Sequence, residues 1–217
     1  MTPDYAHARD LMVEQQVRPW DVLDARVLDV LAAMPRELFV PPAYIGAAYA
    51  DIALPLAHGE CMLKPVVAGR ALEAIRAQPT DDVLEIGTGS GYVTACLSRM
   101  ARDVVSIEQH ADLAAAARVR LEAQGIANAR IEVADALTWH SDRHFDAICV
   151  NGAVATIPAH FVSMLKPGGR LFIVRGREPA MEAVLLRNES GGPRIESLFE
   201  TDIPYLAGAA PVPVFHL

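Results

Sequence analysis

Three glycines at alternate positions, Gly87, Gly89 and Gly91, follow an apolar run in the middle of the chain. The run is Val83–Ile86, and a helix-compatible segment, Val93–Ala101, comes directly after the glycines. Glycine allows a sharp turn and lets a ligand approach the backbone without meeting a Cβ atom, and the following helix offers unpaired N–H groups. The pattern therefore predicts a strand, a ligand-binding turn and a helix, against the simpler alternative of a turn that only joins a strand to a helix.

The spacing of these glycines bears on the kind of ligand. Gly-x-Gly-x-Gly differs from the dinucleotide fingerprint Gly-x-Gly-x-x-Gly. Glu85, two residues before Gly87, places a carboxylate beside the ligand and disfavours a pyrophosphate. S-adenosylmethionine carries a sulfonium, an ammonium and a ribose diol, and no phosphate. The residues thus favour S-adenosylmethionine over NAD.

Acidic residues end three successive predicted strands: Glu85, Glu108 and Asp135. Glu108 lies 17 residues after Gly91, about where a carboxylate that binds a ribose diol is expected. Asp135 with Ala136 is placed to read the adenine edge. Taken together, the predicted cofactor-binding residues are Glu85, Gly87, Thr88, Gly89, Gly91, Glu108, Gln109, Asp135 and Ala136.

Strand-like and helical segments alternate from Asp82 onward, which is typical of parallel βαβ units. We predict strands at 83–86, 104–108, 129–133, 145–150 and 170–174, and helices near 92–100, 111–124 and 158–165. Asn151-Gly152 is predicted as an exit loop, residues 166–169 as a turn, and 183–199 as two strands joined by a hairpin-like loop.

The first 80 residues show a different pattern, with helical periodicity in 8–34, broken at Arg18-Pro19-Trp20. Asp21 is predicted to cap the second helix, and a further helix is predicted near 66–77. We therefore divide the chain into an N-terminal helical cap with a substrate loop, 1–80, and an α/β core, 81–217, within one compact unit. Of the seven histidines, only His58 in the cap is a candidate to face the cleft, with at most a minor role in proton transfer.

Composition excludes several classes of function for these 217 residues. The net charge is −8 and no Lys/Arg-rich run occurs, so we expect no nucleic-acid partner. No apolar run reaches the ~20 residues of a membrane helix, and no secretory signal is evident, which predicts a cytoplasmic protein without a membrane partner. Three widely spaced cysteines predict neither a disulfide framework nor a metal site.

Several blocks of the sequence resemble the protein-L-isoaspartate (D-aspartate) O-methyltransferases. The most specific are Pro35–Val40 and Tyr49–Pro55, and the resemblance covers roughly residues 10 to 175. It implies a Rossmann-like methyltransferase fold with a mostly parallel central sheet, helices on both faces and the helical cap. It also implies protein repair, in which methyl passes from S-adenosylmethionine to the α-carboxylate of isoaspartyl residues. An ionised carboxylate needs little acid–base catalysis, and we assign no catalytic residue.

One block departs from the family pattern. The family usually has Gly-Gln-Thr-Ile-Ser-Gln-Pro where this chain has Gly59–Pro65, so Cys61 and Leu63 replace two hydroxyl residues. Leucine donates no hydrogen bond to a carboxylate and a thiol is a weak donor. The residues of this substrate loop are Cys61, Met62, Leu63 and Lys64. We therefore expect weak isoaspartyl methylation unless Lys64 or the loop backbone holds the carboxylate.

Three hypotheses remain open. The first is a methyltransferase that acts on isoaspartyl proteins or peptides. The second is a family member that acts on another acceptor, such as a small molecule suited to a more apolar pocket. The third is a protein that binds the cofactor without turnover and acts through a partner. The sequence leaves the acceptor and the oligomeric state open.

Overall fold

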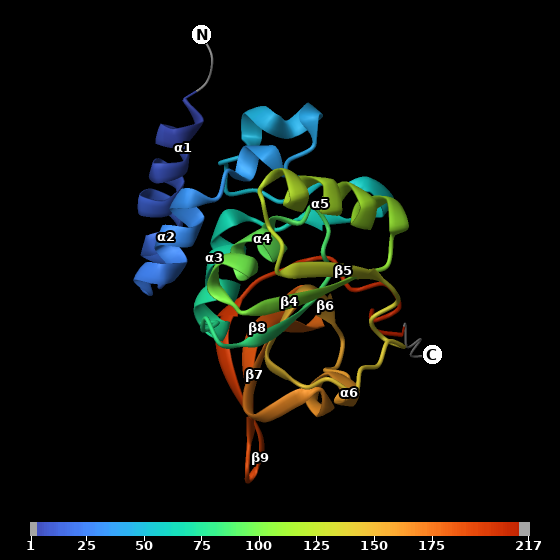
Figure 1. The fold of residues 1–217 in the computed structure, drawn as a ribbon. Coiled ribbons are helices and arrows are strands. Elements are labelled where there is room, and N and C mark those ends of the chain that lie inside the picture. Colours follow the sequence, from blue (N-terminus) through green and yellow to red (C-terminus); the bar gives the residue numbers. More distant parts are fainter. Residues whose placement is uncertain (1–3, 213–217) are drawn as a thin grey trace, which may run out of the picture.

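The computed structural model describes residues 4–212, and a seven-stranded sheet forms the centre of the molecule (Figure 1). The strand order is β5-β4-β3-β6-β7-β8-β9. The strands β3, β4, β5, β6 and β7 run parallel to one another, and β8 and β9 pair antiparallel at one edge. The strands of this sheet are β3 Asp82–Ile86, β4 Asp103–Glu108, β5 Ala129–Val133, β6 Phe145–Val154, β7 Leu165–Arg177, β8 Ala180–Glu189 and β9 Gly192–Glu200. This is the Rossmann-like methyltransferase architecture that the sequence predicts.

The helices follow the predicted segments closely. They are α1 Tyr5–Leu11, α2 Ala25–Ala33, α3 Pro65–Ile75, α4 Tyr92–Met100, α5 Ala111–Ala123 and α6 Ala159–Ser163. A π-helical segment, Met12–Val17, and a short 3₁₀ turn continue α1 toward α2. Two further strands, β1 Leu54–Pro55 and β2 Cys61–Met62, form a small separate sheet in the cap.

Successive apolar residues of the central strands point to opposite faces of the sheet. Val83 and Val104 join the cluster that includes residues of α2 to α5, whereas Leu84 and Val105 join the cluster under α6. A strand buried on both faces reads as a continuous apolar run. Both faces are thus covered, as the predicted fold requires.

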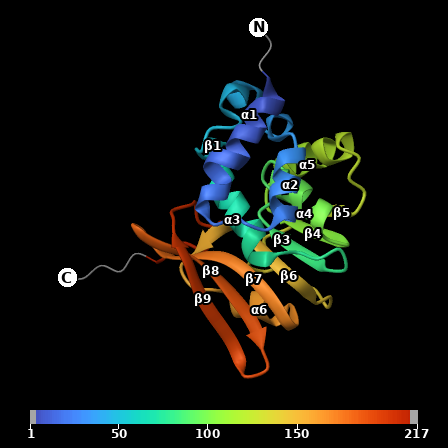
Figure 2. The same ribbon diagram turned by 90° about the vertical axis from the view of Figure 1, so that its left-hand side faces the viewer.

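The cap and the α/β core share the larger of these two clusters. Leu28 and Leu31 of α2 lie in it together with Ala95 and Leu97 of α4. Figure 2 shows α1 and α2 at one end of the molecule and the β8–β9 hairpin at the other. The division into 1–80 and 81–217 stays a prediction, but the two segments share one apolar core.

Three local predictions were wrong. Asp24, not Asp21, caps α2: its Oδ1 accepts a hydrogen bond from Arg26 N at 2.9 Å. Asn151-Gly152 lies inside β6 because that strand continues to Val154, where Ala153 pairs with Val174 of β7 and also with Tyr205 of the C-terminal tail. Residues 166–169 lie within β7, where the register jumps from Phe145↔Leu165 to Ala147↔Arg170, so the predicted turn is an irregularity within the strand.

Asp82, at the start of β3, is the centre of an ion-pair cluster that stabilises the fold. Burial opposes its ionisation, but hydrogen bonds from Arg102, Lys166 and Arg143 outweigh burial and lower the pKa of Asp82 to about 2. The pKa of Asp82 is lower in the folded protein than its ordinary value of 3.8, so ionised Asp82 adds to the free energy of unfolding above about pH 3.8. This contribution is lost as the pH falls toward 2.

We predict that Asp82→Asn lowers the free energy of unfolding by about 2 kcal/mol at pH 6, because the substitution removes the ion pairs of a carboxylate whose side chain is only 8% exposed. The difference from the unmodified protein should shrink toward pH 2. Urea unfolding between pH 2 and pH 6 measures it, with Asp10→Asn as the control because Asp10 is exposed. If the free energy of unfolding of Asp82→Asn changed with pH between pH 2 and pH 6 as it does in the unmodified protein, this role of the cluster would be contradicted.

Candidate functional site

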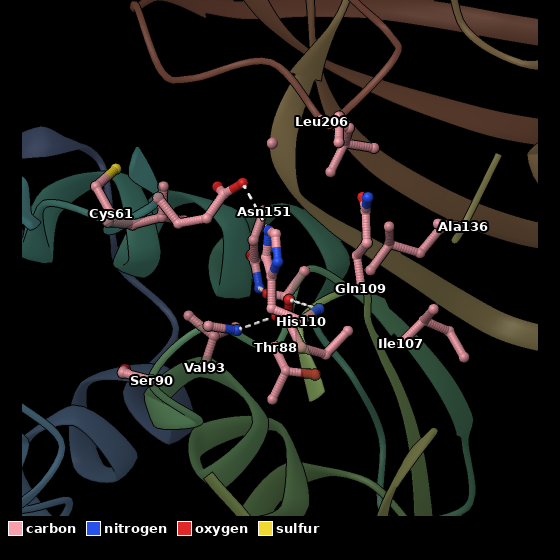
Figure 3. Close-up of a pocket in the computed structure, with 18 of the residues that line it drawn as sticks. Cys61, Thr88, Ser90, Val93, Ile107, Gln109, His110, Ala136, Asn151 and Leu206 are labelled. Atoms are coloured by element: carbon pink, nitrogen blue, oxygen red, sulfur yellow. Dashed lines mark hydrogen bonds and ion pairs between the residues drawn. The ribbon is translucent and has the colours of Figure 1, made fainter. Parts of the chain in front are cut away.

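A pocket opens at the carboxyl ends of β3, β4, β5 and β6, where ligands bind in open α/β sheets. The space between its lining residues is about 830 Å³, which includes open solvent. Figure 3 shows Cys61 at one end of the group, Ala136 and Leu206 at the other, and Asn151 and His110 between them. Seven of the nine predicted cofactor residues and three of the four substrate-loop residues therefore line one pocket, whereas Glu85, Gly91 and Lys64 do not.

The glycine turn has the conformation that its sequence predicts. Gly87, Gly89 and Gly91 have φ values of 89°, 52° and 85°, which side-chain-bearing residues rarely adopt. A Cβ atom on Gly91 would lie 3.1 Å from Ala117 Cβ on α5. Gly91 thus lets α4 begin close against α5, while Gly87, Thr88 and Gly89 line the pocket.

Glu108 lies at the end of β4 and fixes the glycine turn. Its Oε2 accepts a hydrogen bond from Gly89 N at 2.8 Å, and its Oε1 accepts one from His110 N at 3.0 Å. The residue is 5% exposed and lines the pocket beside Gln109. Each carboxylate oxygen keeps a further lone pair, so the group can hold the turn and accept from a ribose diol at once.

Asp135 and Ala136 follow β5 and line the pocket, as predicted. Asp135 is exposed, and its Oδ1 accepts a hydrogen bond from Leu137 N at 2.9 Å. Ala136 accepts a hydrogen bond through its backbone oxygen from the His160 ring, with the two atoms 3.0 Å apart. The loop after β5 is thereby fastened to α6, which keeps the backbone of 135–136 beside the pocket.

Glu85, predicted to lie beside the ligand, does not line the pocket. Its carboxylate is fully buried and is not among the pocket-lining side chains. Oε2 accepts hydrogen bonds from Thr94 and Ser106 at 2.5 and 2.6 Å, and Oε1 accepts one from Asn151 Nδ2 at 2.8 Å. Glu85 is therefore a positioning residue, which joins α4, β4 and β6 under the glycine turn.

Burial raises the pKa of Glu85 to about 7, against the three hydrogen bonds that favour its ionised form. Because the folded-state pKa exceeds the unfolded value of 4.5, the free energy of unfolding should fall as the pH rises from about 4.5 to 7. We predict that Glu85→Gln removes this loss, so its stability relative to the unmodified protein rises by about 3 kcal/mol between pH 5 and pH 8. Urea unfolding at both pH values measures the difference.

The matched control is Glu122→Gln on the exposed side of α5, for which no such change with pH is expected. A constant difference between Glu85→Gln and the unmodified protein from pH 5 to pH 8 would show that the buried carboxylate does not titrate in this range.

Only part of the substrate loop lines the pocket. Cys61, Met62 and Leu63 line the pocket, whereas Lys64 is not among the lining residues and stands at the N-terminal end of α3. Burial raises the pKa of the Cys61 thiol, so it is neutral near pH 7. Lys64 therefore does not supply the missing donor in this structure, and the loop presents a thiol, a thioether and an alkyl group.

A short segment of the cap is tied to the start of α5 beside the pocket. His58 Nε2 lies 2.9 Å from Asp112 Oδ1, and the His58 and His110 rings stack with their centroids 4.1 Å apart. His110 Nε2 lies 3.7 Å from Glu60 Oε1. Burial, followed by the nearby charge of Glu108, raises the pKa of Glu60. His58 itself is not among the lining residues, so its role is to hold the segment and not to face the cleft.

The C-terminal tail covers the other end of the pocket, which the sequence did not predict. Leu206 N donates a hydrogen bond to Ala153 O at 2.9 Å, and Tyr205, Leu206 and Ala207 line the pocket. A Cβ atom on Gly152 would lie 2.6 Å from Leu206 Cδ2, so glycine is needed for this close approach. Besides the tail, sequence reasoning missed further residues that line the pocket, among them Glu60, Arg36, Tyr92, His110, Asn151 and Gly152.

Neither a metal-binding cluster nor a membrane-spanning helix is found in the residues that the structure describes. Within residues 4–212, no group of three His, Cys, Asp or Glu side chains is arranged to hold a metal ion. No helix in the same range is long and apolar enough to cross a membrane.

Comparisons with known proteins agree with this geometry. Residues 8–200 match the family model described as protein-L-isoaspartate(D-aspartate) O-methyltransferase. A protein-L-isoaspartate O-methyltransferase of Methylorubrum extorquens is 42% identical over 196 residues, which are 90% of this chain and 85% of that protein. Its counterpart in Koribacter versatilis is 38% identical over 188 residues, 86% of this chain and 85% of that protein.

Solved structures show the same fold. A Plasmodium falciparum protein described as a protein-L-isoaspartate O-methyltransferase, in complex with S-adenosyl-L-homocysteine, superposes with a TM-score of 0.80. The superposition covers 91% of this chain and 97% of that one, at 19% identity. From the family model and the relatives at 42% and 38% identity, the chain belongs to the protein-L-isoaspartate(D-aspartate) O-methyltransferase family.

Proposed function

We propose that this protein transfers a methyl group from S-adenosylmethionine to the α-carboxylate of isoaspartyl residues in proteins or peptides. The observation that carries the proposal is the joint placement of the glycine turn, Glu108 and Asp135 at one pocket, in a chain of this family. The chemistry of this donor set fits the cofactor, because carboxylates suit a diol and an amine and disfavour a pyrophosphate.

Glu108 would hold the ribose diol, and the backbone of the glycine turn would approach the methionine part of the cofactor. Asp135 and Ala136 would read the adenine edge, with Gln109 beside them. Bound S-adenosylmethionine supplies a methyl group on a sulfonium, a good leaving group, so an ionised carboxylate acceptor needs no general base. What the chain contributes is alignment and exclusion of water.

The cap supplies the acceptor side of the pocket in this proposal. Cys61, Met62 and Leu63 form one wall, and Leu206 of the tail closes the other end. Segments 1–80 and 81–217 then have separate tasks, acceptor binding and cofactor binding. We also propose a cytoplasmic location, which the free thiols of Cys61, Cys96 and Cys149 support because cytosolic cysteines are kept reduced.

Calorimetric titration tests the cofactor half of the proposal. S-adenosylmethionine and S-adenosylhomocysteine should bind, and NAD should not, because a pyrophosphate has no favourable partner among Glu108 and Asp135. Tight NAD binding without a response to either adenosyl ligand would overturn it.

A second candidate function keeps the cofactor and changes the acceptor. The observation that favours it is the apolar substrate wall, in which Leu63 replaces a hydroxyl residue. Incubating the protein with methyl-labelled S-adenosylmethionine and a cell extract separates the two. Label in base-labile protein esters supports isoaspartyl methylation, and label in a small molecule supports the second candidate.

A further inference from the structure

Arg36 is a fully buried cation in the wall of the pocket. It begins the 3₁₀ turn Arg36–Leu38 after α2, is 0% exposed, and lines the pocket. Its Nε donates a hydrogen bond to Ala48 O at 2.8 Å, and its Nη2 donates one to Leu63 O at 2.7 Å. Both partners are neutral carbonyls, and no carboxylate forms an ion pair with Arg36 in residues 4–212.

The third nitrogen of this guanidinium has no partner at all. Nη1 is buried and makes no hydrogen bond. The guanidinium carbon lies 4.9 Å from the centroid of the Tyr92 ring, which offsets part of the desolvation of the cation. Burial still lowers the pKa of Arg36. An arginine buried without an anion is costly, so a missing anionic partner is the simplest reason for its presence.

The position of Arg36 shows which anion it would meet. It lines the same pocket as Cys61 and Leu63, and it holds the backbone of Leu63 directly. These are the residues at which the loop lacks hydroxyl donors. Taking the proposed function as its basis, we propose that Arg36 Nη1 binds the acceptor carboxylate and so supplies a donor in place of one of the two hydroxyls missing from the loop.

The geometry of the bound guanidinium suits a nucleophilic carboxylate. Nε and one N–H of Nη2 donate to Ala48 O and Leu63 O, which leaves Nη1, with its two N–H groups, as the guanidinium nitrogen that has no partner. A carboxylate oxygen that accepts a hydrogen bond from Nη1 keeps a further lone pair, so the bound acceptor can still attack the methyl group. The neutral ester pairs less well with the cation, which favours its release.

Access to Nη1 requires a local movement. The atom is covered, so an incoming carboxylate reaches it only when pocket side chains shift, and Met62 in the same wall has a flexible side chain. Low dielectric around the buried site strengthens the charge pair once it forms.

Steady-state kinetics of Arg36→Lys test the proposal. Lysine keeps a charge but loses the fork, so the KM for an isoaspartyl peptide should rise about ten- to a hundredfold. The Kd for S-adenosylhomocysteine should stay within about twofold. Arg70→Lys is the matched control, because Arg70 also bridges two backbone carbonyls, of Trp20 and Leu198, but lies outside this pocket.

The relative affinity for two peptides distinguishes binding of the carboxylate by Arg36 from a purely structural role of Arg36. The unmodified protein should bind an isoaspartyl peptide more tightly than the same peptide with a neutral α-carboxamide, and Arg36→Lys should lose most of this preference. A loosened fold would weaken both peptides equally and would overturn the proposal. So would an unchanged KM, or a loss confined to S-adenosylhomocysteine, which would assign Arg36 to the cofactor's own carboxylate.

Nuclear magnetic resonance of the unmodified protein keeps the proposal testable should Arg36→Lys not fold. The guanidinium resonances of Arg36 should shift on saturation with the isoaspartyl peptide and stay in place with the carboxamide peptide. No shift at saturation would overturn the proposal. If the unmodified protein fails to methylate any isoaspartyl peptide, the proposed function fails first, and that outcome is distinct from active enzyme with unaffected Arg36.

Discussion

Replacing Glu108 with Ala should weaken binding of S-adenosylmethionine about ten- to a hundredfold, equivalent to about 1–3 kcal/mol. Two effects add. The cofactor loses the carboxylate that would hold its ribose diol, and the N–H groups of Gly89 and His110 lose their acceptor, which releases the glycine turn. Calorimetric titration with S-adenosylhomocysteine measures the loss.

Glu108→Gln is not a silent replacement in this setting. Both carboxylate oxygens accept from backbone N–H groups, so an amide must turn its NH₂ group toward one of them. We expect it to lose affinity as well, though less than Ala. Glu122→Ala, on the exposed side of α5, is the control. Unchanged affinity in Glu108→Ala would remove Glu108 from the cofactor site.

The double variant Cys61→Thr, Leu63→Ser should methylate an isoaspartyl peptide faster than the unmodified protein. Each restored donor to the carboxylate is worth about 1.5–3 kcal/mol, so one effective hydroxyl raises kcat/KM about ten- to a hundredfold. Cofactor affinity should change little, since neither residue belongs to the glycine turn. Steady-state kinetics with the peptide as the varied substrate measure the gain.

Leu63 is 5% exposed, so the serine variant also loses apolar burial, and its stability must be measured alongside activity. Cys61→Ser, which restores one hydroxyl without changing Leu63, is the matched control. A stable double variant with no gain would show that the loop hydroxyls are dispensable in this chain and that Arg36 suffices.

The strands and helices of the core were predictable because their signals are local. Tyr92–Met100 and Ala129–Val133 have the predicted bounds, since glycine turns and β-branched runs mark their ends. The predictions that were wrong depend on distant partners. Asn151-Gly152 has the composition of a loop, yet it is part of β6, because Ala153 beyond it pairs with Val174 of β7 and with the tail.

Glu85 shows what the pattern of the strand could have told us. In β3, alternate side chains point to the same face, so Glu85 shares the face of Val83, which packs in the cluster that includes the cap. A carboxylate at that position lies between sheet and helices, where Thr94, Ser106 and Asn151 meet it. An acidic residue before the glycines correctly indicated a site. The structural role of Glu85, however, follows from the face of the sheet to which its side chain points.

Arg36 and Leu206 lay beyond local reasoning for a different reason. Arg36 is far in sequence from the glycine turn and reaches the pocket through the fold of the cap, and Leu206 reaches it through pairing of the tail with β6. Neither segment has a periodicity that indicates a pocket. Only the block Pro35–Val40, which carries the family resemblance, pointed toward Arg36.

The central claim is that this pocket joins S-adenosylmethionine to an isoaspartyl carboxylate. Its most direct test is transfer of labelled methyl from S-adenosylmethionine to an isoaspartyl peptide, measured beside the matching aspartyl peptide. We predict base-labile label in the isoaspartyl peptide and none in the aspartyl peptide. A protein that binds the cofactor yet labels neither peptide, or labels both equally, would contradict the claim.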